Sequence, residues 1–449
     1  MVQKFIESGY EIVNQHEKAD IYVINTCTVT NMSDRKSRQM LRRVKEINNQ
    51  AIVVACGCYA QVAKSELEKI EEIDLILGNN EKKEIVKYVE EFAEKNENSL
   101  SCSNAIVENS ENEPQKLVEI EDVMYKKEFV DFGDVTYTEK TRAVIKVQDG
   151  CDRFCSYCII PYARGRVRSR KPESIISEIK KIAKEGIKEV VITGIHVASY
   201  GKDFKFEENK KQYRLIDLLE EINKINGIER IRLGSIEPLL INEEFMKRLT
   251  KLEKICHHFH LSLQSGCDET LKRMNRRYTT EQFRKIVSIL RKNYNDVILT
   301  TDIIVGFPGE TEKEFEETYQ FLKEIKFYKM HIFKYSPRKG TKAAAMKEQI
   351  DGNKKEQRSQ RLIELSNVNE KEYNESYVGQ TVQVLFEEEK DGVYKGHTKN
   401  YVQAYLFKDK EQALENRVNT EGKVLRKIEN EIVEVTCYKA EQEYIIVRI

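Results

Sequence analysis

Long apolar runs are absent from this sequence, and so is a secretory leader. No stretch approaches the roughly 18 consecutive apolar residues that a membrane-spanning helix needs. The first residues, MVQKFIESGYEIV, lack the apolar run and the small-residue cleavage site of a signal peptide. These absences argue against a membrane protein and a secreted protein. We expect a cytoplasmic protein without a membrane partner.

An excess of charge of one sign is also missing. Lysine and arginine together number 75, aspartate and glutamate together number 75, and the formal net charge at pH 7 is zero. This balance excludes the protein-wide basic field that marks many nucleic-acid-binding proteins, so any contact with RNA must come from local basic patches. Apolar residues make up 40% and charged residues 33% of the chain, which is enough for real cores with charged surfaces.

Ten cysteines are present, and their chemistry has to be explained. The cytosol keeps thiols reduced, so disulfide bonds are not expected there. Clustered cysteines in a cytosolic chain indicate a metal site or a catalytic site instead.

The 449 residues are enough for two to four domains, since domains usually hold about 100 to 200 residues. Across residues 1–98, short apolar runs alternate with amphipathic helices, which predicts a parallel, doubly wound α/β sheet. Such a fold normally opens on a strand. This pattern begins inside a helix, so we expect the N-terminal domain to be incomplete. Residues 99–136 turn polar and acidic without a sustained period, which predicts a linker.

Residues 137–369 carry six apolar runs separated by amphipathic helices, the first of them at 141–149. This pattern fits an open or partial (β/α) barrel, in which the chemistry lies on loops after the carboxyl ends of the strands. One run, HFHLSLQS, alternates polar and apolar residues. This alternation predicts a polar face toward the lumen or, as the alternative, a half-exposed edge strand. Short strands with glycine-containing turns predict a small β-barrel at residues 372–441.

Three cysteines directly follow the first barrel strand, at the reactive end of the barrel. Cys151, Cys155 and Cys158 form a Cys-x-x-x-Cys-x-x-Cys motif. An iron-sulfur cluster normally takes four thiolates, so three leave one iron open to bind and reduce a small molecule. The main alternative is a structural zinc site, which would usually add a fourth Cys or His at paired spacing, and none follows Cys158 nearby. The motif therefore predicts a redox-active 4Fe–4S cluster.

With Tyr157 just before its last cysteine, this motif resembles the hallmark of the radical S-adenosylmethionine (SAM) superfamily. The resemblance implies that SAM chelates the open iron and that Tyr157 lies near the adenine of SAM. Electron transfer would then split SAM into methionine and a 5′-deoxyadenosyl radical. Residues at later strand ends are similar to the SAM-contacting positions of the superfamily: Thr193, Gly194, Glu237 and Gln264.

The phrase CIIPYARGRVRSR, which begins at Cys158, resembles the methylthiotransferase family, and with the two flanking domains the resemblance covers nearly the whole chain. In that family the motifs NTCTVT and GCYAQ hold a second iron-sulfur cluster that delivers sulfur, which implies Cys27 and Cys58 as ligands. Without the resemblance, both are equally compatible with buried small hydrophobic residues. The family's third ligand lies in a Gly-Cys motif that would precede Met1. We expect a misplaced start or a truncated chain, with a genuine loss of methylthiolation as the alternative.

Two further features indicate contact with RNA. Arginines alternate beside the cysteine loop in a pattern that suits phosphate, with an ordinary solvated surface as the alternative: Arg164, Arg166, Arg168 and Arg170. In the last domain, GHTKNY at 396–401 resembles the TRAM RNA-binding module. This resemblance implies that single-stranded RNA stacks on Tyr401, and a purely structural role is equally compatible with the composition.

The segments YARG and VRSR most resemble the branch of the family that adds a methylthio group to carbon 2 of N6-threonylcarbamoyladenosine beside the anticodon of tRNA. The radical would remove hydrogen from carbon 2, the second cluster would supply sulfur, and a second SAM would donate methyl. Flavodoxin or ferredoxin would supply electrons, and loop bases can be unstacked into a pocket. The alternatives are methylthiolation of isopentenyladenosine in tRNA or of a ribosomal protein aspartate, and a non-catalytic RNA-binding remnant.

Overall fold

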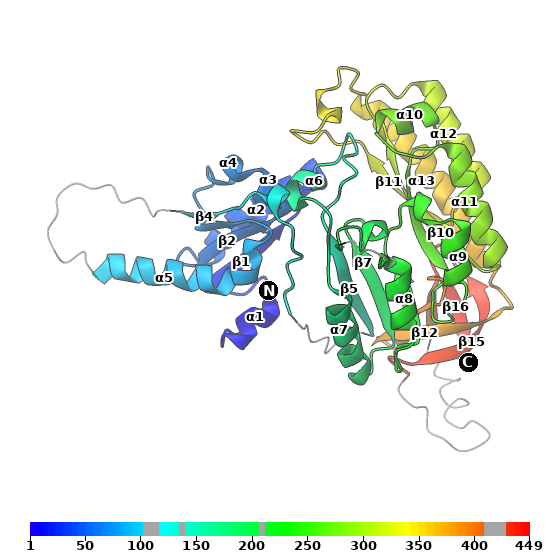
Figure 1. The fold of residues 1–449 in the computed structure, drawn as a ribbon, viewed down its shortest axis with the longest axis horizontal. Helices are drawn as coiled ribbons and strands as arrows, with labels where there is room; N and C mark the ends of the chain where they lie inside the picture. The colour runs from blue at the N-terminus through cyan, green and yellow to red at the C-terminus, as the bar shows by residue number, and fades with distance from the viewer. Residues whose placement is uncertain (102–115, 134–140, 206–211, 408–427) are drawn as a thin grey trace, which may run out of the picture. The chain divides into compact units, whose positions relative to one another are not determined.

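The structure is a computed structural model that describes residues 1–101, 116–133, 141–205, 212–407 and 428–449 (Figure 1). The described chain divides into two compact units. The first unit holds residues 1–136, 149–168 and 336–345, and the second holds residues 137–148, 169–335 and 346–449. No helix of the described ranges is both long and apolar enough to cross a membrane.

Four parallel strands form the sheet of the first unit, in the order β1-β2-β3-β4. They are β1 (Ile21–Thr26), β2 (Ile52–Gly57), β3 (Leu75–Leu77) and β4 (Leu117–Glu119). In β2, Val53 and Ala55 belong to one buried cluster, whereas Val54 and Cys56 belong to another. Both faces of the sheet are therefore covered, as is usual for parallel strands.

Different helices cover the two faces. Leu41 of α2 and Tyr59 of α3 share the cluster of Val53, whereas Phe5 of α1 and Val89 of α5 belong to the opposite cluster. The helices of this unit are α1 (Val2–Glu7), α2 (Asn31–Ile47), α3 (Cys58–Val62), α4 (Lys64–Leu67), α5 (Ile85–Ser101) and α6 (Ile160–Arg164). The predicted doubly wound α/β fold is confirmed.

The segment that we expect to be a linker contributes to this sheet. Leu117 pairs with Leu75 in the register of β4 and β3, and Val123 in the 3-10 helix η3 (Val123–Tyr125) is buried. Strand β4 covers an edge of β3 that would otherwise present unpaired backbone groups. A strand of three residues is too short to show a period, which explains why the sequence pattern does not reveal it. The expected linker residues 102–115 and 134–136 lie outside the described residues.

The second unit is built around an open barrel of six parallel strands that follow one another in chain order. One sheet has the order β6-β5-β7-β8 and the other β11-β10-β9, and isolated bridges from Ile231 to Ile255 and from Ile236 to Leu261 connect them. The six strands are β5 (Arg142–Asp149), β7 (Glu189–Gly194), β8 (Arg230–Leu233), β9 (His258–Gln264), β10 (Ile298–Val305) and β11 (Lys329–Lys334), and the two-residue β6 (Arg168–Ser169) adds to the edge of β5. The predicted partial (β/α) barrel is confirmed.

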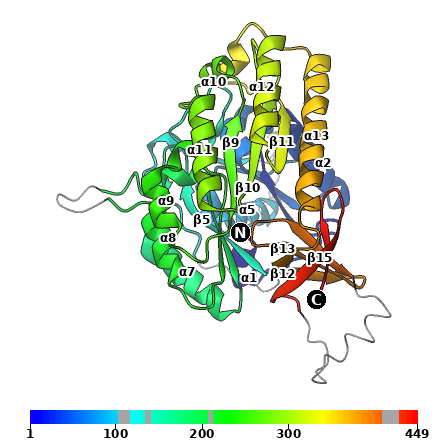
Figure 2. The ribbon, with the colours of Figure 1, turned by 90° about the vertical axis from the view of Figure 1, so that its right-hand side faces the viewer.

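Amphipathic helices cover the outer side of these strands, and Figure 2 shows α11, α12 and α13 side by side. The ring of Phe283 in α11 lies 6.0 Å from the ring of Phe321 in α12. Thr279 and Thr311 cap α11 and α12 with side-chain oxygens that accept from backbone N–H groups. The helices are α7 (Pro172–Lys184), α8 (Leu215–Asn223), α9 (Glu243–Leu249), α10 (Asp268–Arg273), α11 (Thr280–Asn293), α12 (Glu312–Ile325) and α13 (Gly352–Glu375).

Strand β9 shows the predicted alternation of apolar and polar side chains. Leu261 is fully buried in the main core cluster of the second unit. The polar side meets the neighbouring strand β10, where His258 Nε2 and His260 Nδ1 each lie 3.0 Å from Thr300 Oγ1. His260 Nε2 also lies 3.2 Å from Asp302 Oδ2. The polar side chains of β9 are therefore bonded to polar side chains of the adjacent strand β10.

A closed barrel ends the second unit, with the strand order β12-β13-β14-β16-β15. Its strands are β12 (Thr381–Lys390), β13 (Val393–Thr398), β14 (Gln403–Phe407), β15 (Ile432–Ala440) and β16 (Ile445–Arg448). Val384, Phe386 and Val447 lie in its core. Because β16 pairs with both β14 and β15, closure needs residues beyond the predicted domain end at 441.

A buried ionic cluster joins the two barrels of the second unit. Glu189, which is 1% exposed, accepts from Arg232 Nε at 2.8 Å and lies 3.3 Å from Arg142 Nε. Arg230 lies within ion-pair distance of the same carboxylate and donates to the His397 carbonyl of the small barrel at 3.0 Å. Burial alone would raise the pKa of Glu189, but these guanidinium groups hold it below its ordinary value.

Replacing Glu189 with glutamine is expected to lower the unfolding free energy of the second unit by about 3 kcal/mol or more, because buried guanidinium groups lose their counter-charge. Since the folded pKa of Glu189 lies below 4.5, the stabilisation is complete above that pH and is lost as the pH falls through the folded pKa. Urea denaturation followed by circular dichroism measures both effects. The control Glu281→Gln removes an exposed pair with Lys285 and is expected to leave the midpoint unchanged. Equal midpoints for E189Q and the wild type would contradict the role of the cluster.

Candidate metal centre and active site

The three motif cysteines lie in the loop between β5 and α6, and all three are half-buried. The loop folds back on itself, because the Cys151 N–H donates to the Gly165 carbonyl at 3.0 Å and the Cys158 N–H donates to the Cys155 carbonyl at 2.9 Å. Gly150 has a φ of +71°, and a Cβ atom there would lie 1.8 Å from the Arg166 carbonyl oxygen. Only glycine fits this close backbone approach.

The donors of this loop suit an iron-sulfur cluster. Burial raises the pKa of Cys151 to about 11, and the neighbouring Cys155 adds to the rise. A free thiol here would stay protonated, whereas ligation to iron takes the thiolate, so a metal has to displace the proton. Within the described ranges, no three His, Cys, Asp or Glu side chains already surround one point as metal ligands would. The fit therefore rests on the donor set, which is three half-buried thiols in one short loop.

The two other predicted ligands follow neighbouring parallel strands of the first unit. Cys27 comes directly after β1 and is exposed, and Cys58 comes directly after β2 and is half-buried. Gly57, which precedes Cys58, has a φ of +104°, and a Cβ atom there would lie 2.4 Å from the Thr26 carbonyl oxygen. The close approach of the two strand ends brings Cys27 and Cys58 to the same edge of the sheet.

Arg164 in α6 connects Cys58 to the start of the cysteine loop. Its Nε donates to Cys58 Sγ at 3.1 Å, and its Nη1 lies 3.6 Å from the carboxylate of Asp149, two residues before Cys151. Burial alone would lower the pKa of Arg164, but Cys58, Asp149 and Cys27 raise it above its ordinary value. The charged guanidinium thus donates to the sulfur of Cys58 and pairs with the carboxylate that lies two residues before Cys151.

A buried and a half-buried asparagine, together with a further arginine, connect α6 to the segment after β3 within the first unit. Asn79 Nδ2 donates to the Ala163 carbonyl at 2.8 Å and lies 3.8 Å from Cys58 Sγ. Arg168 donates to Asn80 Oδ1 at 3.2 Å and to the Arg164 carbonyl at 2.7 Å. Neither asparagine is recognisable as a site residue from the sequence, because an Asn-Asn pair after a short strand resembles an ordinary turn.

The four arginines that we expect at an RNA-facing rim have different surroundings. Arg166 is exposed, pairs with Asp152 at 3.3 Å and covers the Phe154 ring. Arg164 is half-buried against Cys58, and Arg168 is 1% exposed. Arg170 is 6% exposed and pairs with the buried Glu178. The buried guanidinium groups of Arg168 and Arg170 are bonded to acceptors of the chain, and Arg166 is the most exposed of the four.

The predicted SAM-contacting residues lie at the carboxyl ends of adjacent barrel strands. Thr193 and Gly194 end β7, Glu237 follows β8, and Gln264 ends β9 with a φ of +74°. Glu237 is 5% exposed and accepts from Arg276 Nη2 at 3.2 Å. This common edge is the reactive end of a (β/α) barrel. Tyr157 is half-buried directly before Cys158.

Two further residues, His196 and Arg276, lie beside Glu237. His196 Nε2 lies 3.5 Å from the Glu237 carboxylate, and the backbone N–H of His196 donates to Gln148 Oε1 at 2.7 Å. His196 ends the segment TGIH at 193–196, which also holds Thr193 and Gly194 and is similar to a SAM-contacting segment of the superfamily. Arg276 follows α10 within the run NRR, where nothing in the sequence indicates a site.

Tyr401 lies in the ionic cluster that joins the two barrels of the second unit. Its ring stacks on His397 with centroids 4.6 Å apart, and Arg232 lies 4.4 Å from the ring centre. Arg142 donates to its hydroxyl at 3.1 Å. An RNA base would have to displace these neighbours to stack on Tyr401, so the contacts of this chain favour the structural alternative.

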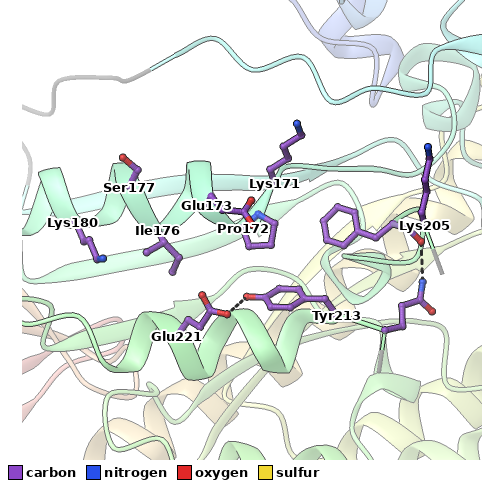
Figure 3. A pocket seen from close by; sticks show the side chains of 11 residues that line it. Lys171, Pro172, Glu173, Ile176, Ser177, Lys180, Lys205, Tyr213 and Glu221 are labelled. Atoms are coloured by element: carbon purple, nitrogen blue, oxygen red, sulfur yellow. Dashed lines mark hydrogen bonds between the residues drawn. The ribbon is translucent and has the colours of Figure 1, made fainter. Parts of the chain in front are cut away.

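A groove between α7 and α8 is separate from the cysteines (Figure 3). It is lined by Ile176 and Lys180 of α7 and by Glu221 of α8, whose carboxylate accepts from the Tyr213 hydroxyl at 2.9 Å. None of the predicted site residues lines it. The groove therefore takes no part in the candidate site.

Two family models match the chain. The radical SAM superfamily matches residues 145–322, and a family described as uncharacterized protein family UPF0004 matches residues 1–78. Among solved structures, the radical SAM methyltransferase TsrM from Kitasatospora setae superposes with a TM-score of 0.50 at 17% identity, covering 71% of this chain and 65% of that chain. This likeness supports the fold. As in the radical SAM superfamily generally, the cofactors are a 4Fe–4S cluster and SAM.

Similar curated proteins cover most of the chain. The threonylcarbamoyladenosine tRNA methylthiotransferase MtaB of Bacillus subtilis is 38% identical, over 96% of this chain and 94% of that protein. MtaB of Aquifex aeolicus is 43% identical, over 86% of this chain and 88% of that protein. A tRNA-2-methylthio-N(6)-dimethylallyladenosine synthase of Clostridium botulinum is 36% identical, over 85% of this chain and 80% of that protein. This chain belongs to the radical SAM methylthiotransferase family.

Proposed function

We propose that the protein adds a methylthio group to carbon 2 of N6-threonylcarbamoyladenosine beside the anticodon of tRNA. The observation that carries the proposal is the position of Arg164, which contacts Cys58 and the carboxylate of Asp149 next to the cysteine loop. Methylthiolation of a carbon needs hydrogen removal and sulfur delivery at one place. An arginine that bonds to Cys58 and pairs with Asp149, two residues before Cys151, suits that need, and the MtaB relatives carry this activity in their names.

Each group of residues has a part in this proposal. Cys151, Cys155 and Cys158 would hold the first cluster, while Cys27 and Cys58 would hold the second. When bound, the first cluster and SAM supply an electron and a 5′-deoxyadenosyl group that can remove hydrogen from carbon. Residues at the strand ends of the second unit would orient SAM: Thr193, Gly194, Glu237 and Gln264.

The surroundings of Glu237 suit a group that fixes a polar ligand. Its carboxylate is nearly fully buried and is held by Arg276 and His196, so its orientation is set before a ligand arrives. A preorganised carboxylate binds hydroxyl or amino groups without a further loss of side-chain entropy. Tyr157, directly before a cluster ligand, would pack on the adenine of SAM.

The proposed partners are tRNA and a small electron-transfer protein such as flavodoxin or ferredoxin, and the proposed location is the cytoplasm. Basic residues on the exposed side of α2 suit the RNA backbone: Arg35, Lys36, Arg42 and Arg43. The anticodon loop suits a radical enzyme, because its bases can be unstacked and presented singly.

Anaerobic reconstitution of the protein tests the assignment of the cysteines. Two clusters require about eight irons per chain, since each takes about four. We expect Cys155→Ala to lose about half of the iron and all formation of 5′-deoxyadenosine from SAM, and Cys58→Ala to lose methylthio product while 5′-deoxyadenosine still forms. Cys437→Ala removes a buried cysteine of the small barrel and is the control. Full iron content and turnover in C155A would contradict the assignment.

Replacing Arg164 with glutamine separates its electrostatic role from radical formation. Losing one charge-assisted hydrogen bond to sulfur is expected to lower the rate of methylthiolation roughly ten- to hundredfold. The rate of 5′-deoxyadenosine formation should change less, and Arg164→Lys should recover part of the loss. Arg166→Gln, two residues away and exposed, is the matched control. Equal losses in R164Q and R166Q would assign the effect to RNA binding.

A further inference from the structure

A polar cleft of about 710 Å³ opens in the first unit beside both cysteine groups. Residues of α2, α3, α6 and the segment 338–340 line it. Three of its lining residues directly follow cysteines that we predict to hold clusters: Thr28, Tyr59 and Ile159. A molecule in the cleft would therefore lie next to the reacting groups.

The floor of the cleft carries an ion pair whose hydrogen bonding is incomplete. Asp34 and Arg338 are 8% and 6% exposed and are bonded to each other. Arg338 also donates to Thr28 Oγ1, and to Asn31 Oδ1 at 2.6 Å. In the part of the chain that the structure describes, Asp34 Oδ1 and Arg338 Nε have no hydrogen-bond partner. Buried polar atoms without partners cost free energy, which a ligand in the cleft would recover.

The two unpartnered atoms specify the chemistry of the ligand. Asp34 Oδ1 is an acceptor and Arg338 Nε is a donor, so a simple anion would be repelled by Asp34 and a simple cation by Arg338. An apolar group would leave both atoms unpaired. A neutral group that presents N–H and C=O side by side, such as an amide or a urea, satisfies both.

Positive charge at the outer part of the cleft adds a second requirement. Arg38 is half-buried and Lys339 is exposed. Arg38 is held in place by donating to the Tyr59 hydroxyl at 2.6 Å, and that hydroxyl donates to Glu66 at 2.8 Å. In this outer part of the cleft, the acidic side chain of Glu66 is outnumbered by the basic side chains of Arg38 and Lys339. The net positive charge suits a carboxylate on the ligand.

We propose that this cleft binds the threonylcarbamoyl group on N6 of the target adenosine, an inference that rests on the proposed function. Carbon 2 and the N6-bearing carbon of adenine both adjoin N1, so a base whose carbon 2 lies between the cysteine groups extends its N6 substituent into the adjoining cleft. The urea of that substituent pairs with Asp34 and Arg338. Its carboxylate pairs with Arg38 and Lys339. An isopentenyl substituent would satisfy none of these groups.

Binding to two tRNA preparations tests the cleft separately from catalysis. One carries threonylcarbamoyladenosine beside the anticodon, and the other is the same tRNA with unmodified adenosine there. We expect the wild type to bind the modified tRNA more tightly, and the double variant Arg38→Gln, Lys339→Gln to reduce that preference about tenfold, as expected for the loss of charged contacts to one carboxylate. Asp34→Asn keeps the shape of the floor and is expected to reduce the preference as well.

The matched control is the double variant Lys36→Gln, Arg43→Gln, which removes two exposed charges of α2 outside the cleft. It should weaken binding of both tRNAs equally. An unchanged preference in the cleft variants, or an equal loss for both tRNAs, would overturn the assignment and leave the cleft as a contact for the RNA backbone. Failure of the proposed function has a different signature, which is absence of methylthio product from the modified tRNA with the wild-type enzyme.

Discussion

The candidate site depends on the two contacts of the Arg164 guanidinium. Arg164 belongs to a short helix directly after the cysteine loop, yet its Nε bonds to the sulfur of Cys58, more than a hundred residues earlier in the chain. Its second contact, with Asp149, fixes the start of the same loop. A side chain that is charged, planar and rich in donors can hold a carboxylate and a sulfur at once. Asn79 adds a second connection, because its amide donates to the Ala163 carbonyl of α6 and lies 3.8 Å from Cys58 Sγ.

Much of the fold could be predicted from the sequence, because periodic patterns report burial directly. The alternation in β9 and the apolar runs of β1 and β2 appear in the structure as strands with the predicted sides buried. The exceptions are short or terminal elements. Strand β4 has three residues and β16 has four, so neither completes a recognisable period. Both strands are stabilised by pairing with strands that lie elsewhere in the sequence, and a local sequence pattern does not reveal such pairing.

The candidate site was predictable where chemistry is concentrated in a motif, and not where it depends on a single polar contact. The cysteine spacing identifies the loop of Cys151 from its own residues. The alternating arginines carry a less specific signal, since Arg168 and Arg170 have the same sequence pattern as Arg166 but are buried against acceptors. Whether an arginine faces solvent or a carboxylate is decided by tertiary packing. The contacts of Asn79 and Arg338 are likewise not predictable from the sequence, because their partners Ala163 and Asp34 lie far away along the chain.

The walls of the polar cleft are joined to the cysteines by single peptide bonds. Thr28, Tyr59 and Ile159 cannot shift far without moving the sulfur atoms beside them. The segment 338–340 and the cleft-facing side of α2 carry no cysteine and are free of this constraint. Divergence between family members with different substrates should therefore collect in these two segments, while the walls next to the cysteines stay alike. Sorting chains of the family by the residues at positions 34, 38, 338 and 339 would group them by substrate more sharply than overall identity does.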